Sequence, residues 1–198
     1  MKILHIISQS PDFTGSGKFI REIIRQSTLS GHENHLLAGA QADFQMTPSL
    51  IPASQCSFVR FDGKDLDYPI PGMSDIMPYK STLFSTLKEE KLSAYKRVFE
   101  KKIRAAIDEI KPDILHTHHL WLVSAITRKA APHIPMVTTC HGTCLRQHHL
   151  AKNIGASIKE DLVNIDRVIA LSRDQKQQII KTLDMSSDRI SIISGGYN

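Results

Sequence analysis

Histidine is the residue type with the most chemical potential in this sequence. Seven of its ten histidines lie within residues 116–149, and two of its three cysteines lie there as well. Imidazole and thiolate groups are the ligands that zinc favours. In an extended segment, however, His116 and His118 point to one side and His119 to the other, and a C-x₃-C pair alone is not a structural zinc pattern. We therefore expect no metal site.

His141 is a better candidate for chemistry than the other histidines. It leaves the end of an apolar, β-branched run and directly precedes Gly142. That position places an imidazole at the mouth of a crevice, where it can hydrogen-bond a hydroxyl group or move a proton near neutral pH.

The glycine-rich stretch Gly15-Ser16-Gly17 precedes a helical pattern. Glycine permits close backbone approach, and the free N–H groups at a helix start favour an anion such as a diphosphate. A Walker loop would need Gly at position 12 and a dinucleotide fingerprint would need Gly at position 20, but the chain has Asp12 and Ile20. A tight turn before a helix is therefore the alternative interpretation.

The cysteines suggest no nucleophilic centre. Cys140 neighbours His141, but neighbours on a strand point to opposite faces, so we expect Cys140 in the core. Cys144 is the one cysteine that we consider as a possible reactive thiol. No G-x-S-x-G elbow occurs. Three cysteines cannot all pair with one another, so a reducing cytoplasm is the expected compartment.

Strands and helices alternate along the chain and must position these residues. Short apolar runs predict strands, i, i+3, i+4 stripes predict helices, and Ser172 with Gln175 forms a helix capping box. The predicted strands are 2–7, 36–38, 57–61, 114–121, 136–140, 167–171 and 190–193, and the predicted helices are 18–30, 92–110, 122–131 and one after Ser172. This order predicts an α/β, Rossmann-like, doubly wound parallel sheet of about seven strands with helices on both faces.

In such a sheet, ligands bind at the carboxyl ends of the strands, where the winding reverses. Gly15-Ser16-Gly17, the segment 116–121 that ends in Trp121, and the segment 141–149 should therefore converge there. Residues 41–80 contain five prolines and little periodicity. They predict either an elaborated loop that folds over a site or a plain surface insertion.

Composition and charge limit the classes of function. The 198 residues, 41% apolar and 23% charged, suit one globular domain spanning 1–198. The net charge of +5 comes mostly from basic residues that are interleaved with Glu. This pattern indicates a solvated helix face, and contact with an anionic lipid or a phosphorylated ligand is the alternative. No nucleic-acid partner is expected. No apolar run approaches the roughly 20 residues of a membrane helix, and the N-terminal run is too short for a signal peptide.

Five segments and their order along the chain resemble retaining glycosyltransferases of the GT-B type (family 4-like, glycosyl transferases group 1). The similar features are a glycine loop and helix followed by Gly-His-Glu, a Pro-Asp segment ending in His-x-His, a strand ending in His-Gly, an apolar strand followed by Ser, and a closing strand and turn. They lie at residues 14–34, 111–118, 135–143, 168–172 and 190–198. Two departures are Cys144, where these enzymes often have Asp, and the closing turn from Ser194 to Asn198.

The resemblance implies the N-terminal, acceptor-side domain of an enzyme that transfers a sugar from a nucleotide-sugar to an acceptor with retention. It implies that Gly15, Ser16 and Gly17 bind the donor diphosphate and that His141 is the catalytic residue. The residues expected to bind the acceptor or sugar, together with the 41–80 loop, are His118, His119, Trp121 and Arg146.

The resemblance further implies no metal or other cofactor, and a donor-binding C-terminal domain that the 198 residues do not contain. The chain alone should therefore be inactive. The expected location is the cytoplasm, with peripheral contact to the inner face of the membrane as an alternative. Two other functions are left open: a stand-alone binding or regulatory module for a phosphorylated or sugar ligand, and half of a sugar-nucleotide epimerase.

Overall fold

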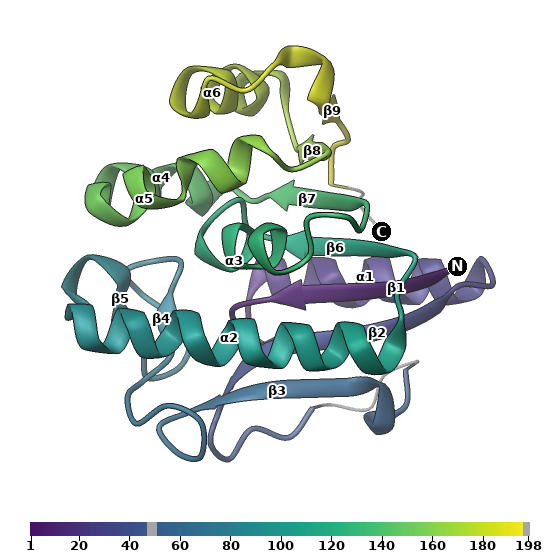
Figure 1. Ribbon diagram of the computed structural model, residues 1–198, viewed down its shortest axis with the longest axis vertical. Coiled ribbons are helices and arrows are strands. Elements are labelled where there is room, and N and C mark those ends of the chain that lie inside the picture. Colours follow the sequence, from purple (N-terminus) through teal and green to yellow (C-terminus); the bar gives the residue numbers. More distant parts are fainter. Residues whose placement is uncertain (47–50, 196–198) are drawn as a thin grey trace.

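The computed structural model describes residues 1–46 and 51–195 and contains one central parallel sheet (Figure 1). Its seven strands lie in the order β3-β2-β1-β6-β7-β8-β9, so the chain starts in the middle, winds to one edge, returns beside β1 and winds to the other edge. The strands are β1 (Lys2–Ile7), β2 (Glu33–Gln41), β3 (Cys56–Phe61), β6 (Ile114–His118), β7 (Met136–Cys140), β8 (Arg167–Ala170) and β9 (Ile190–Ile192). The predicted doubly wound α/β fold is confirmed.

The helices cover both faces of this sheet. They are α1 (Gly15–Leu29), α2 (Glu89–Ile110), α3 (Leu122–Ala130), α4 (Gly142–Leu150), α5 (Lys152–Val163) and α6 (Arg173–Leu183). Helix α1 packs Ile20 and Ile24 against Ile7, Leu36 and Ala38 on one face, whereas α2 and α3 lie on the opposite face, in front of the sheet in Figure 1. None of the helices within the described residues is both long enough and apolar enough to cross a bilayer.

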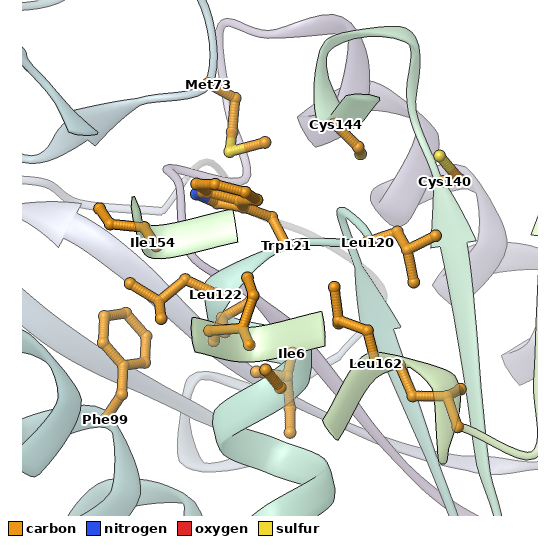
Figure 2. Packing of buried hydrophobic residues seen from close by; sticks show 14 of the residues in the cluster. Ile6, Met73, Phe99, Leu120, Trp121, Leu122, Cys140, Cys144, Ile154 and Leu162 are labelled. Atoms are coloured by element: carbon orange, nitrogen blue, oxygen red, sulfur yellow. The ribbon is translucent and has the colours of Figure 1, made fainter. Parts of the chain in front are cut away.

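The larger core lies on the face covered by α2 and α3. Helix α2 places Tyr95, Phe99 and Ile103 on one stripe, at the spacing of a helix, and all three side chains are fully buried. Trp121 is in the middle of the same core, near Met73 and Leu122 (Figure 2). This core joins α2 and α3 to the central strands of the sheet.

The segment between β3 and α2 belongs to the fold and is not a plain insertion. Leu66, Tyr68 and Ile70 are buried in the larger core, and the chain then forms two short parallel strands, β4 (Pro71–Gly72) and β5 (Thr82–Leu83). Short 3₁₀ turns complete the chain at Ala53–Gln55, Phe84–Thr86 and Ser187–Arg189. Of the five prolines in 41–80, Pro48 lies outside the described residues.

Several element boundaries differ from the predictions for physical reasons. Helix α1 begins at Gly15 and not at residue 18, because Thr14 Oγ1 caps it by accepting the Gly17 N–H at 2.9 Å. The strand predicted over 114–121 ends at His118, because His119 adopts a left-handed φ of 74°. Helices α4 and α5 lie in residues 142–163, for which the sequence pattern predicts no helix.

The predicted cap of α6 is present in a shifted form. Ser172 Oγ accepts the Gln175 N–H at 3.1 Å, as expected, but the Gln175 side chain accepts from Leu171 N–H and not from Ser172 itself.

Candidate functional site

A cavity of about 580 Å³ lies at the carboxyl edge of the sheet, on the side where α4 and β4 lie in Figure 1. It sits at the point where the winding reverses between β1 and β6, the expected position for a ligand in this fold. Its lining comes from the segments that follow β1, β4, β6, β7 and β8: Gln9, Phe13, Thr14, Gly15, Ser16, Phe19, Met73, Ser74, Ile76, Met77, Pro78, His119, His141, Gly142, Thr143 and Leu171.

Two helices begin at the wall of this cavity. Gly15 and Ser16 open α1, and Gly142 and Thr143 open α4. The first N–H groups of a helix have no intrahelical acceptor, and within the described residues no other acceptor bonds the N–H of these four residues. The positive ends of two helix dipoles therefore meet at one place, which favours an anionic ligand.

The glycines of this region have different roles. A Cβ added at Gly15 or at Gly142 would meet no atom within 4 Å, so both backbones are open to a ligand. A Cβ at Gly17 would lie 2.6 Å from the carbonyl oxygen of Pro11. Gly17 therefore lets α1 pack closely against the segment after β1, and it does not line the cavity.

His141 is the N-cap residue of α4 and lines the cavity beside His119 and Phe19. Its ring centroid lies 4.8 Å from that of His119 and 5.3 Å from that of Phe19. Burial lowers the pKa of His141 to about 4, so the imidazole is neutral near pH 7. A neutral ring has one donor and one acceptor nitrogen. Its Nε2 lies 3.4 Å from His118 Nδ1, so a ligand hydroxyl that bonds this nitrogen must replace that contact.

His119 lines the cavity because of its backbone conformation. Its left-handed φ turns the side chain away from the strand pattern, and its Nδ1 lies 3.6 Å from the Cys144 Sγ. Cys144 in turn accepts the His141 N–H at 3.2 Å and is completely buried. The idea that Cys144 is a reactive, accessible thiol is therefore wrong, while the expected burial of Cys140 is confirmed.

Four of the expected site residues do not line the cavity. Besides Gly17, His118 is completely buried below His141, with its Nδ1 3.4 Å from His141 Nε2. Trp121 is 1% exposed and packs edge-on against Phe84. Arg146 lies outside and forms an ion pair with the Asp75 carboxylate.

The end of the 41–80 stretch does fold over the cavity, as one of the two interpretations expects. Residues 73–78 supply Met73, Ser74, Ile76, Met77 and Pro78 to the lining. Gln147 Nε2 of α4 donates to the Met73 carbonyl oxygen at 3.0 Å, and the Arg146–Asp75 ion pair lies beside it. Helix α4 therefore holds this segment, which we call the 73–78 strap, against the site.

Sequence reasoning missed the apolar part of the lining. Phe13 is 68% exposed and has a left-handed φ of 69°, which is uncommon for a bulky residue. Ile76, on the strap, is 89% exposed. Both are large apolar side chains beside the cavity, and no periodic pattern in the sequence marks them.

Comparisons with known proteins support this architecture. The sequence profile of the family described as Glycosyltransferase Family 4 matches residues 13–198. A comparison with curated proteins gives no match. Among solved structures, sucrose-phosphate synthase from Thermosynechococcus elongatus is similar with a TM-score of 0.66 and 15% identity, over 100% of this chain and 49% of that chain.

Two further solved structures show the same relationship. The Anabaena protein HepE, in complex with UDP and glucose, has a TM-score of 0.60 and 16% identity, over 100% of this chain and 45% of that one. The UDP-GlcNAc 2-epimerase from Neisseria meningitidis, bound to UDP-GlcNAc, has a TM-score of 0.57 and 13% identity, over 97% of this chain and 46% of that chain. At these identities the likeness establishes the fold, and the chain spans about half the length of each.

Proposed function

Because this chain belongs to glycosyltransferase family 4, we propose that it is the N-terminal, acceptor-side domain of a retaining GT-B enzyme. Such an enzyme transfers a sugar from a nucleotide-sugar donor to an acceptor. The observation that carries this proposal is the cavity at the switch point, into which two helix N-termini and a neutral histidine project.

The donor diphosphate is proposed to rest on the backbone of Gly15 and Ser16, with Gly142 and Thr143 completing the anion site. Negative charge grows on the diphosphate as the sugar leaves. Fixed N–H dipoles in a cavity stabilise that charge without having to reorganise. No lysine or arginine lines this cavity within the described residues, so the backbone supplies most of the electrostatic stabilisation from this half of the cleft.

His141 is proposed as the catalytic residue, because its neutral ring lies at the cavity wall and can hydrogen-bond the transferred sugar. His119 is proposed to share that contact. The acceptor is proposed to bind against the strap, with Arg146 acting through its ion pair with Asp75. His118 and Trp121 are then positioning residues, since both are buried beneath the site.

The second half of the cleft is proposed to come from a donor-binding domain outside these 198 residues, because the chain spans about half the length of its structural relatives. The chain alone should then be inactive. We place the enzyme in the cytoplasm, with peripheral contact at the inner membrane face as the alternative, because all three cysteines are free thiols.

The test is to express the longest open reading frame that contains these residues and to assay sugar transfer with a panel of nucleotide-sugars. A His141→Gln variant should lower kcat/KM by roughly 10²-fold if the ring acts at the reacting centre. His149→Gln is the matched control, because His149 is exposed on the same helix and does not line the cavity. Normal turnover by residues 1–198 alone would contradict the half-site proposal.

An epimerase function is the second candidate, favoured by the fold shared with the Neisseria epimerase. The two activities differ in one requirement, because an epimerase converts its nucleotide-sugar without an acceptor. Product analysis in the absence of any acceptor therefore separates them: a new nucleotide-sugar indicates epimerisation, whereas transfer requires the acceptor.

A further inference from the structure

Three histidines from the two central strands meet below the cavity floor. His5 of β1 and His116 of β6 are register partners, and His118 lies two residues further along β6, on the same face. Each offers one ring nitrogen, and these three nitrogens all lie within 4.8 Å of one another. All three side chains are buried, at 1%, 8% and 0% exposure.

Each ring is held by a hydrogen bond to a residue outside the trio. His5 Nε2 pairs with the Asn34 side-chain oxygen at 3.0 Å, and His116 Nε2 pairs with Thr139 Oγ1 at 2.9 Å. His118 Nδ1 pairs with His141 Nε2 at 3.4 Å. A histidine that binds a metal ion through one nitrogen is usually held in this way through the other.

The opposite nitrogens of two rings are left without a partner. Within the described residues, His5 Nδ1 and His118 Nε2 are buried and make no hydrogen bond. Unpaired polar atoms in a protein interior are costly, and a ligand bound between these rings would satisfy both nitrogens.

We propose that His5, His116 and His118 form a zinc(II) site that joins β1 to β6 beneath the sugar-transfer cavity. Three imidazole nitrogens suit Zn²⁺, which takes a fourth ligand to complete its tetrahedral coordination. With zinc–nitrogen bonds of about 2.0–2.1 Å, tetrahedral ligand atoms lie about 3.4 Å apart. The nitrogens must therefore approach one another by up to about 1.4 Å, which small rotations of the rings can supply.

Inspection of residues 116–149 alone could not reveal this set. The alternation of His116, His118 and His119 separates the ligands of that segment, and the third ligand comes from a strand more than a hundred residues earlier. Parallel pairing of β1 with β6 brings His5 to the other two. The inference does not depend on the proposed sugar transfer, because it concerns residues below the cavity and a different ligand.

The test is metal binding by the chain purified without a histidine tag and stripped with a chelator. Zn²⁺ should bind at one ion per chain in competition with a chromophoric indicator. Co²⁺ should give the intense visible absorption of a four-coordinate ion with nitrogen ligands. Zn²⁺ should also raise the Tm of the wild-type chain, because it binds the folded state preferentially.

Variants separate this site from other histidines. His5→Gln and His116→Gln should abolish the four-coordinate Co²⁺ spectrum, and Asn34→Leu should weaken Zn²⁺ binding by about 10- to 100-fold. His35→Gln is the matched control on the neighbouring strand, where His35 pairs with Glu33, and it should bind like wild type.

Two results would overturn the proposal, and both use only the wild-type chain, so a variant that fails to fold leaves the test intact. One is the absence of stoichiometric Zn²⁺ binding together with an unchanged Tm. The other is a weak, octahedral Co²⁺ spectrum. Equal loss of binding in the His35→Gln variant would also contradict the assignment of the ligands.

Discussion

Replacing Gly17 by alanine should destabilise the protein, because no space exists for the added methyl group. The new Cβ would lie 2.6 Å from the carbonyl oxygen of Pro11, 2.7 Å from its carbonyl carbon and 2.9 Å from the capping Oγ1 of Thr14. Two of these are backbone atoms, which cannot move aside without displacing the start of α1. Overpacking of this kind costs about 1–3 kcal/mol.

Two smaller effects modify this figure and nearly cancel. Disturbing the Thr14 cap costs about 1 kcal/mol, whereas alanine in place of glycine within a helix gains roughly 0.5–1 kcal/mol. The net loss in the free energy of unfolding is therefore about 2 kcal/mol. For a chain of this size that corresponds to a decrease in Tm of roughly 4–8 °C.

Gly15→Ala is the matched control, because Gly15 lies two positions before Gly17 in the same helical turn. No atom lies within 4 Å of its added Cβ, so the free energy of unfolding should be unchanged or raised by up to about 1 kcal/mol. Urea unfolding followed by far-UV circular dichroism measures both variants. Equal destabilisation by Gly15→Ala and Gly17→Ala, or none by Gly17→Ala, would refute the separation of a packing glycine from a ligand-facing one.

Three further predictions concern stability. Phe99→Ala should lower the free energy of unfolding by about 3–5 kcal/mol, because the fully buried ring packs 4.5 Å from Tyr95; a loss below 1 kcal/mol at constant urea m-value would contradict the placement of Phe99 in the core. Arg128→Leu should lower the free energy of unfolding by about 2–3 kcal/mol, because the buried guanidinium donates hydrogen bonds to the Ala131 and Ile134 carbonyl oxygens. Its ion-pair partner Asp166 is half-exposed, so little of this loss should depend on the salt concentration. Burial lowers the pKa of His148 from 6.5 to about 4, so the neutral ring stabilises the fold fully above pH 6.5 and this contribution is lost as the pH falls toward 4. Between pH 7.5 and pH 5 this one group should account for about 2 kcal/mol. A His148→Gln variant should lose correspondingly less stability over that interval, and parallel pH profiles for the two proteins would disprove the assignment.

Much of the fold is predictable because its signals are local. The alternation of short apolar runs with helical stripes fixes the parallel sheet, and Pro112 marks the end of α2 one residue beyond the left-handed Lys111. Helix α4 was not predicted because its N-cap is His141 and no Ser, Thr, Asp or Asn marks its start.

The candidate site is predictable only where it follows strand ends. Gly15, Ser16, His119 and His141 come directly after strands or open the next helix, and all four line the cavity. The positions of the remaining site residues depend on contacts between distant segments of the chain.

Trp121 shows why such contacts escape a sequence pattern. It directly precedes α3 after the left-handed turn at His119, and that turn directs the indole into the core beside Phe84. Similarly, the strap reaches the cavity through Gln147, which lies 74 residues further along the chain than Met73.

The central claim is that an anionic diphosphate binds across the N-termini of α1 and α4, and amide NMR tests it most directly. Titration of the ¹⁵N-labelled chain with UDP should shift the backbone amides of Gly15, Ser16, Gly142 and Thr143 most strongly, even if half a cleft binds weakly. Unchanged amides at these four positions at saturating UDP, or larger shifts at the opposite edge of the sheet around His133 and Arg189, would contradict it.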